Sequence, residues 1–321
     1  MANTPVRMVS YNWDHLQPLA AGDVRPEGID LAMERGRLAR LAAEPDVDLA
    51  ETSLSHYLIG LSRGERGAVG LPVFLMRSFR HRCFLVRRDS PLHDFPDLVG
   101  KRIGTDGWAN TGNTWSRAAL RERGIDIAGI TWLVGPPEAH SPVFRPASAP
   151  VYPPYVGDIP AGQNLVDMLL AGDLDALMIP FPPRGSFAKE SPIVHLFRDF
   201  RATEQAYFAR VGYCPGIHVA VMRRSVFERD PTLAVRLYAA FEASKRRWRE
   251  DRRRLADTTP WVLLELEETA ALLGEDWQPY GVAPNRPMLA DFCAEQLAQG
   301  LVTAPLDADA AFADFQAVAR G

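Results

Sequence analysis

The sequence has few cysteines, and they lie far apart. Cys83, Cys214 and Cys293 are the three cysteines of a 321-residue chain. An odd number without Cys-x-x-Cys spacing predicts neither a disulfide framework nor a cysteine metal site. We therefore interpret all three as buried thiols in a reducing compartment.

The sequence also lacks an excess of basic charge. Its formal net charge is -4 and its isoelectric point is about 6.0. A protein without a basic field does not hold a polyanion by neutralising phosphates, so nucleic acid is excluded as an expected partner.

Long apolar runs and targeting signals are missing as well. No stretch of about 18 apolar residues occurs, so no membrane span is expected. The first residues lead into a strand-like segment without the basic, apolar and small-residue regions of a secretory signal. This pattern predicts a cytoplasmic protein.

Metal-ligating spacings such as His-x-His or His-Glu-x-x-His are absent too. We expect no metal ion and no other cofactor. The alternative is a site assembled from separate segments, with Asp14, Glu51, His81 and His218 as its donors.

What the sequence does have is an ordinary globular composition and a regular alternation of strand-like and helical segments. With 47% apolar and 24% charged residues, the chain can form two lobes of about 150 residues each. Strands are expected at 6–11, 48–51, 71–74, 83–87, 101–105, 130–134, 176–179 and 216–222, and residues 24–31 are expected to form a turn followed by a strand. Helices are expected at 36–43, 54–61, 165–170, 231–255, 259–273 and 284–300, with another beginning after Thr105.

This order predicts an α/β protein whose chain crosses twice between lobes. Residues 1–90 plus 215–321 are expected to form a discontinuous first lobe, and residues 91–214 an inserted second lobe. We expect the ligand to bind in the cleft between the lobes.

Several short phrases carry a resemblance to a known family. They are Val24-Arg25-Pro26-Glu27-Gly28 behind Asp14, Ala50-Glu51-Thr52-Ser53, Phe79-Arg80-His81-Arg82, Gly100-Lys101-Arg102-Ile103-Gly104, His218-Val219-Ala220-Val221-Met222 and Pro279-Tyr280-Gly281-Val282. In number, order and spacing, from about residue 8 to residue 301, such phrases resemble the 4,5-dihydroxyphthalate decarboxylase family.

The resemblance implies a type II periplasmic-binding-protein-like fold, with mixed sheets flanked by helices. It also implies metal-independent conversion of 4,5-dihydroxyphthalate to 3,4-dihydroxybenzoate and carbon dioxide. The chain departs from the family pattern at three places, which are His15, the segment Tyr213-Cys214-Pro215-Gly216-Ile217 and the proline-rich loop 136–160.

Decarboxylation of a hydroxylated arene needs a base for a phenol proton and an acid that delivers a proton to the ring carbon. His81 and His218 are the candidates, because an imidazole with a pKa of about 6.5 serves as either. Asp14 and Glu51 follow first-lobe strands and could orient a histidine or accept a catechol proton. The alternatives are structural histidines, and carboxylates that cap helices or pair with Arg80.

The reaction also needs groups that hold carboxylates. Arg80 and Arg82 could each form two parallel hydrogen bonds, and strand alternation would place them on one face with His81 on the other. The helix start after Thr105 offers free backbone N–H groups to an anion. Further substrate-binding candidates are Ser53, Trp108 as a stacking surface, Asn110, Thr111 and Arg184. Surface ion pairs, a capped helix start and a rigid loop are the competing interpretations.

The expected partner is thus a small aromatic carboxylate. A solute-binding protein for such a ligand, or another lyase on the same fold, are the alternative functions. A homo-oligomer is possible, since the apolar segment Trp261-Val262-Leu263-Leu264 could pack within a lobe or form a dimer face.

Overall fold

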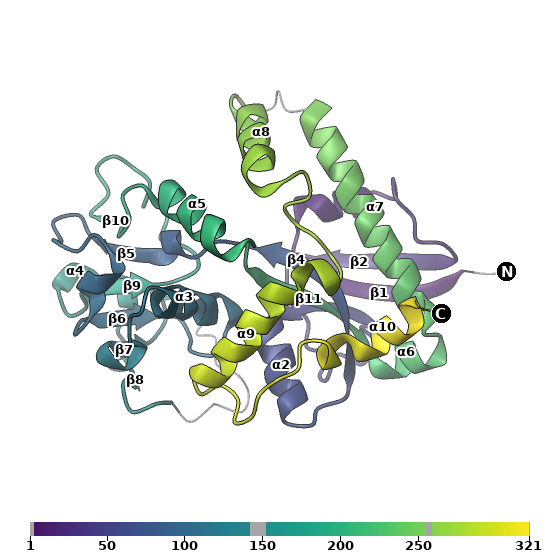
Figure 1. Cartoon of the computed structure of the whole chain (residues 1–321), viewed down its shortest axis with the longest axis horizontal. Coiled ribbons are helices and arrows are strands. Elements are labelled where there is room, and N and C mark those ends of the chain that lie inside the picture. Colours follow the sequence, from purple (N-terminus) through teal and green to yellow (C-terminus); the bar gives the residue numbers. More distant parts are fainter. Residues whose placement is uncertain (1–2, 142–151, 255–258, 321) are drawn as a thin grey trace. The chain divides into compact units, whose positions relative to one another are not determined.

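The structure is a computed structural model, and it describes residues 3–141, 152–254 and 259–320. The centre of the proline-rich loop 136–160 lies outside the described residues. The chain divides into two compact units, each with its own sheet (Figure 1). Unit 1 comprises Met1–Ser78, Tyr213–Cys293 and Ala304–Gly321, and unit 2 comprises Phe79–Gly212 and Ala294–Thr303.

Unit 1 is built on a five-stranded mixed sheet in the order β2-β1-β3-β11-β4. Its strands are β1 (Thr4–Ser10), β2 (Ile29–Arg35), β3 (Leu49–Ser53), β4 (Ala68–Arg77) and β11 (Gly216–Arg223). β1 runs parallel to β2 and β3, whereas β11 runs antiparallel to β3 and β4. β11 thus lies between two strands from the first part of the chain.

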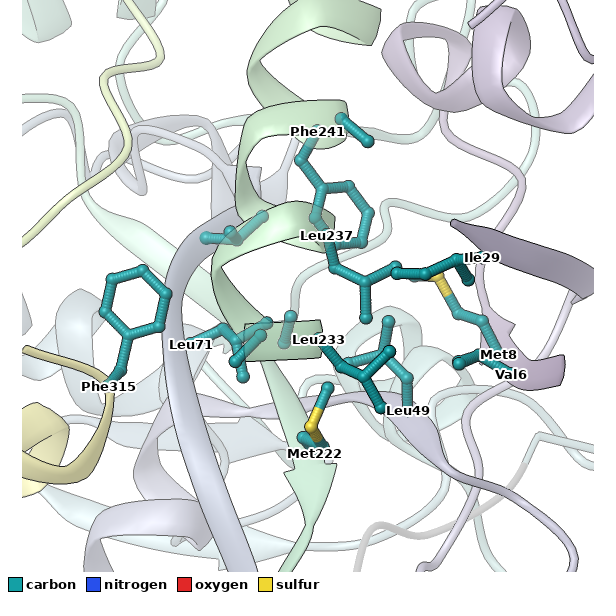
Figure 2. Packing of buried hydrophobic residues seen from close by; sticks show 14 of the residues in the cluster. Val6, Met8, Ile29, Leu49, Leu71, Met222, Leu233, Leu237, Phe241 and Phe315 are labelled. Atoms are coloured by element: carbon teal, nitrogen blue, oxygen red, sulfur yellow. The ribbon is translucent and has the colours of Figure 1, made fainter. Parts of the chain in front are cut away.

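The core of unit 1 lies where helix α7 (Thr232–Arg254) covers this sheet (Figure 2). Leu233, Leu237 and Phe241 recur every four residues, so they share one helix face, and they pack against strand residues such as Leu49 and Met222. Burial of each large side chain stabilises the fold by about 2 kcal/mol. The sheet is therefore a firm support for the loops at its edge.

Shorter helices complete unit 1. They are η1 (Asp14–Leu16), α1 (Gln17–Ala20), α2 (Leu54–Ser62), α6 (Arg224–Arg229), α8 (Val262–Leu273), α9 (Arg286–Ala298, whose last turn belongs to unit 2) and α10 (Ala313–Ala319). The helix expected at 36–43 is wrong. Gly36 has a φ of +109°, which a right-handed helix does not accept, and Arg37 pairs with Glu34 and Glu44 across a turn.

Unit 2 contains a six-stranded mixed sheet in the order β10-β5-β9-β6-β7-β8. Its strands are β5 (Phe84–Arg87), β6 (Arg102–Thr105), β7 (Thr131–Val134), β8 (Val156–Asp158), β9 (Ala176–Met178) and β10 (Ile193–His195), and its helices are η2 (His81–Cys83), η3 (Phe95–Leu98), α3 (Thr111–Glu122), η4 (Ile127–Gly129), α4 (Leu165–Ala171) and α5 (Phe200–Val211). Leu85, Leu165, Leu169 and Leu177 belong to its core.

The boundaries of the two units differ from the expected lobes. Residues 79–90 belong to unit 2, because β5 is antiparallel to both β9 and β10 of that sheet. Residues 294–303 also belong to unit 2, where Glu295 and Gln299 bind Arg121 and Arg117 of α3. Along the described ranges, no helix combines the length and apolarity that a bilayer crossing requires.

Candidate functional site

Glu51 and His218 meet in unit 1. In the register of β3 and β11, Ala220 lies opposite Glu51 and His218 opposite Ser53, so Glu51 and His218 are diagonal neighbours on one face. The pairing of β11 with β4 is irregular on both sides of His218, and such irregularities redirect side chains. His218 Nδ1 lies 2.5 Å from Glu51 Oε1.

The carboxylate of Glu51 is fully buried, yet it is well supplied with donors. The backbone N–H of Tyr11 donates to Oε2 at 2.8 Å, and the indole N–H of Trp13 lies 2.9 Å from both oxygens. Because β1 and β3 are parallel neighbours, the residues after β1 emerge at the edge where β3 ends.

These donors fit an ionised carboxylate, which fixes the proton of a neutral His218 ring on Nδ1. Nε2 is then the nitrogen that can accept a proton.

Aromatic rings surround the imidazole of His218 without closing it off. Tyr11 stacks on it with ring centres 6.1 Å apart, Trp13 meets it edge-on at 6.5 Å, and 14% of the His218 side chain stays exposed. Burial, followed by the charge of Glu51, raises the pKa of Tyr11. Burial and the nearby His218 lower the pKa of His56.

Two residues of η1, His15 and Asp14, differ in their exposure and in their partners. His15 is buried, and burial lowers its pKa to about 4 despite Asp14 and Glu51 nearby. Its Nε2 has no hydrogen-bond partner among the residues described. Asp14 is exposed and pairs with Arg252 at 3.0 Å, so the structure does not bring it to the Glu51–His218 pair.

In unit 2, Arg80 lies against the first turn of α3. Its side chain is 2% exposed, and a Cβ on Gly112 would lie 2.8 Å from its Nη2. The glycine therefore lets the guanidinium approach the helix backbone. Arg80 Nε donates weakly to Ser116 Oγ at 3.4 Å, whereas Nη2 has no hydrogen-bond partner in the described parts of the chain.

The start of α3 has an unusual cap. Asn110 occupies the N-cap position but makes no side-chain capping bond, and its Oδ1 is buried without a partner within the described ranges. Thr111 follows, also buried. Asp106 accepts a 2.7 Å hydrogen bond from Asn113 Nδ2, and burial raises the pKa of Asp106. A buried cation and a helix N-terminus thus lie together.

Two of the predicted residues lie in packed interiors. Arg117 covers one face of the Trp108 ring, 3.7 Å from its centre, and Trp108 is only 1% exposed, so it offers no open face for stacking on a ligand. His81 is 2% exposed among Phe95, Phe197 and Tyr207, and burial lowers its pKa to about 4. These surroundings suit a packed imidazole better than a group that exchanges protons with a ligand.

The alternation considered for Arg80, His81 and Arg82 does not apply, because the chain here enters the 3-10 helix η2 before the strand β5 begins. Arg82 is half-buried, and its backbone N–H donates to Glu204 at 3.2 Å.

Two further candidates are placed by local structure. Ser53 is the N-cap of α2, as expected, and its Oγ accepts a 3.4 Å hydrogen bond from the backbone N–H of His56. Arg184 is exposed in the loop after β9.

The four donors considered for a metal site do not converge. Asp14 pairs with Arg252, and His81 lies among Phe95, Phe197 and Tyr207. Across the described residues, no group of three or more histidine, cysteine, aspartate or glutamate side chains is arranged to hold a metal ion.

Solved structures identify the fold class. The periplasmic aliphatic sulphonate binding protein SsuA from Escherichia coli aligns with a TM-score of 0.57 at 13% identity, over 96% of this chain and 91% of that chain. The desulfurization enzyme DSZB aligns with a TM-score of 0.50 at 15% identity, over 99% of each chain. The chain has the predicted α/β fold of the type II periplasmic binding proteins, a fold that serves binding proteins and enzymes alike.

Two curated proteins of similar sequence share one name. The 4,5-dihydroxyphthalate decarboxylase of Comamonas testosteroni is 29% identical over 301 residues, which are 90% of this chain and 90% of the relative. The protein of the same name from Pseudomonas putida is 28% identical over 207 residues, 63% of this chain and 80% of the relative. No protein-family model matches the chain. The two relatives support the predicted resemblance to the 4,5-dihydroxyphthalate decarboxylase family.

Proposed function

We propose that the protein is a decarboxylase of a hydroxylated aromatic dicarboxylate, with 4,5-dihydroxyphthalate as substrate and 3,4-dihydroxybenzoate and carbon dioxide as products. The names of its two relatives support a decarboxylase of this kind. The structural observation that carries the proposal is the Glu51–His218 pair, since it is a buried carboxylate holding a partly exposed imidazole.

The chemistry asks for proton transfer without a nucleophile. A phenol hydroxyl para to the departing carboxylate loses its proton, the ring carbon that bears the carboxylate gains one, and the carbon–carbon bond then breaks. Its electron pair returns to the ring, which becomes aromatic again as carbon dioxide leaves, and the phenolate oxygen takes back a proton. We assign proton transfer to Nε2 of His218, because Glu51 holds the ring and stabilises the imidazolium formed when Nε2 is protonated.

Binding of a carboxylate is assigned to Arg80 and the start of α3. The unpartnered Nη2 of Arg80 and the backbone N–H groups at Thr111 and Gly112 are donors with positive charge or a positive dipole end. Asn110 and the exposed Arg184 are further polar contacts in this proposal, whereas Trp108 and His81 are given packing roles. The proposal uses no metal or cofactor.

We also propose that the protein works in the cytoplasm. The three cysteines form no disulfide, and two of them, Cys83 and Cys293, are buried thiols, which suits a reducing compartment.

Product analysis tests the proposed reaction. Purified, chelator-treated protein is incubated with 4,5-dihydroxyphthalate, and carbon dioxide and 3,4-dihydroxybenzoate are measured. Stoichiometric release of both supports the proposal. Tight binding of the dicarboxylate without product would instead favour a solute-binding protein, the function that the sulphonate-binding protein of the same fold makes the second candidate.

A further inference from the structure

Three segments of unit 2 leave its sheet at the same edge. Phe84 of β5, Met178 of β9 and Thr105 of β6 lie in register across three neighbouring strands. The residues before β5, after β9 and after β6 therefore meet at one edge of the sheet, where α/β folds place their ligands. These residues are the segment with Arg80, the loop 179–192 and the start of α3.

The side chain of Arg80 crosses the end of β9. Arg80 precedes β5, yet its guanidinium lies against Gly112 in the first turn of α3, which follows β6. Because β9 lies between β5 and β6 in the sheet, a side chain that joins their ends passes over the end of β9. A carboxylate bound by Arg80 and the start of α3 would therefore lie beside the residues that follow β9.

The loop after β9 carries an exposed aromatic ring. Phe181 is 66% exposed, and it lies two residues beyond Ile179, whose backbone N–H donates to the Cys83 carbonyl at 3.0 Å. The Sγ atom of Cys83 lies 3.9 Å from the carbonyl oxygen of Pro180. The backbone N–H of Cys83 donates in turn to the carbonyl of Arg80 at 3.1 Å. The backbone next to Phe181 is thus bonded to the segment that begins with Arg80.

Prolines restrict the backbone on both sides of Phe181. Pro180 precedes it, and Pro182 and Pro183 follow it. A proline fixes its own φ and limits the residue before it to extended conformations, so Pro182 limits the backbone of Phe181. A ring that is held in place before the ligand arrives loses less conformational freedom on binding, which favours affinity.

The other exposed phenylalanine of this loop has a packing partner. Phe187 is 68% exposed, and the centre of its ring lies 4.9 Å from the centre of the His195 ring. His195 Nδ1 donates to the Arg82 carbonyl at 2.8 Å, so Phe187 rests on a ring that is itself fixed. Phe181 has no such ring partner within the part of the chain that the structure describes. Packing therefore accounts for Phe187 but not for Phe181.

The cations and the exposed ring at this edge suit an aromatic acid. Arg80 and the backbone N–H groups of α3 fit a carboxylate, and the exposed Arg184 lies three residues after Phe181. Two aromatic rings attract one another in offset-stacked or edge-to-face arrangements. Trp108, the residue expected to stack on the ligand, is only 1% exposed. Phe181 is the residue of this edge that offers an open face.

We propose that Phe181 is the aromatic contact of the substrate in unit 2. Its ring stacks on the arene whose carboxylate is bound by Arg80 and the start of α3. Phe181 thereby makes the site select an aromatic acid over a saturated acid with the same carboxylates. This inference rests on the proposed function, which supplies the aromatic dicarboxylate.

The test compares phthalate with cis-cyclohexane-1,2-dicarboxylate, which carries the same pair of carboxylates on a saturated ring. Neither has the phenol hydroxyl that the proposed reaction needs, so isothermal titration calorimetry measures binding without turnover. The wild type should bind phthalate about fivefold more tightly than the saturated diacid. Phe181→Leu keeps an apolar side chain without a ring, so it should bring the two dissociation constants to within about twofold of each other. Phe181→Trp, which again offers a ring, should restore the preference.

Phe187→Leu is the matched control, because it removes the other exposed ring of the same loop and should keep the wild-type preference. Circular dichroism checks that each variant is folded. A wild type that binds both diacids equally or binds neither, or a Phe181→Leu variant with the wild-type preference, would overturn the inference. If the wild type prefers phthalate through Phe181 but releases no carbon dioxide from 4,5-dihydroxyphthalate, the proposed reaction fails and the stacking contact stands.

Discussion

At the scale of single residues, His218 depends on Glu51, and Glu51 depends on Tyr11 and Trp13. A buried carboxylate is stable only when its charge is hydrogen-bonded, and here the donors come from the end of β1 and from β11. The proposed role of His218 therefore predicts an effect on turnover when the histidine is replaced and another when Glu51 is replaced.

His218→Asn should lower turnover by about 100-fold or more, the usual contribution of a general acid or base. Glu51→Gln keeps the shape but removes the charge that stabilises the imidazolium, so it should also lower turnover with little change in KM. Steady-state kinetics on 4,5-dihydroxyphthalate measure both effects, with the exposed His93→Asn as control. Turnover unchanged in His218→Asn would remove the assigned role.

Sequence reasoning found part of this cluster for a physical reason. Glu51 is a candidate because it follows a strand of the first lobe, and His218 is one because an imidazole can serve as acid or base. Trp13 and Tyr11 gave no such signal, since their hydrogen bonds depend on β1 lying next to β3, which the sequence alone does not determine. His81 has the same chemistry as His218 but lies among aromatic rings, a setting that only tertiary packing decides.

At the scale of elements, the start of α3 shows how a missing side chain creates room for a charged one. Gly112 has no Cβ, and Arg80 lies where that atom would otherwise force it away.

Local patterns predicted the existence of this helix, the Ser53 cap of α2 and most strands. They failed at 36–43, where a positive φ and local ion pairs override a helix-like composition, and they assigned β5 to the other unit because strand partners are distant in sequence.

Gly112→Ala tests this arrangement. Alanine is the better helix former by up to about 1 kcal/mol, so the variant should be at least as stable as the wild type in thermal unfolding. The new Cβ should nevertheless displace the guanidinium and raise the dissociation constant for the dicarboxylate at least tenfold. Gly129→Ala, where the nearest atom is 3.8 Å from the added Cβ, is the control. Equal affinity in Gly112→Ala and the wild type would contradict the proposed carboxylate contact.

Arg80→Lys separates charge from geometry at the same place. Lysine keeps the positive charge but loses the planar fork that fits a carboxylate. We expect KM to rise about tenfold and turnover to change less, measured beside Arg102→Lys at an exposed ion pair. A larger effect on turnover than on KM would count against a role in binding.

At the scale of the whole molecule, each unit contains one deeply buried histidine with a pKa of about 4, His15 in unit 1 and His81 in unit 2. In the unfolded chain both imidazoles have a pKa near 6.5. Between about pH 4 and pH 6.5 the unfolded state therefore binds more protons, so stability is fully present above about pH 6.5 and is lost as the pH falls toward 4.

Each histidine should contribute on the order of 3 kcal/mol to the full loss, of which about 2 kcal/mol is already present at pH 5. Urea unfolding at pH 8 and pH 5 measures it. His81→Phe, which places a ring of similar size among the same aromatic side chains, should reduce the difference between the two pH values, while His93→Asn should leave it unchanged. An undiminished pH dependence in His81→Phe would show that His81 is not buried in its neutral form.

The placement of Glu51 has a practical meaning for anyone who alters this protein. Its carboxylate is the acceptor shared by the indole of Trp13, the amide of Tyr11 and the ring of His218. The residues after β1, strand β3 and strand β11 of unit 1 therefore meet at this carboxylate. Random mutagenesis for new substrates will seldom tolerate a side chain at this position that cannot accept these hydrogen bonds. Libraries should spare it and diversify the exposed side chains instead.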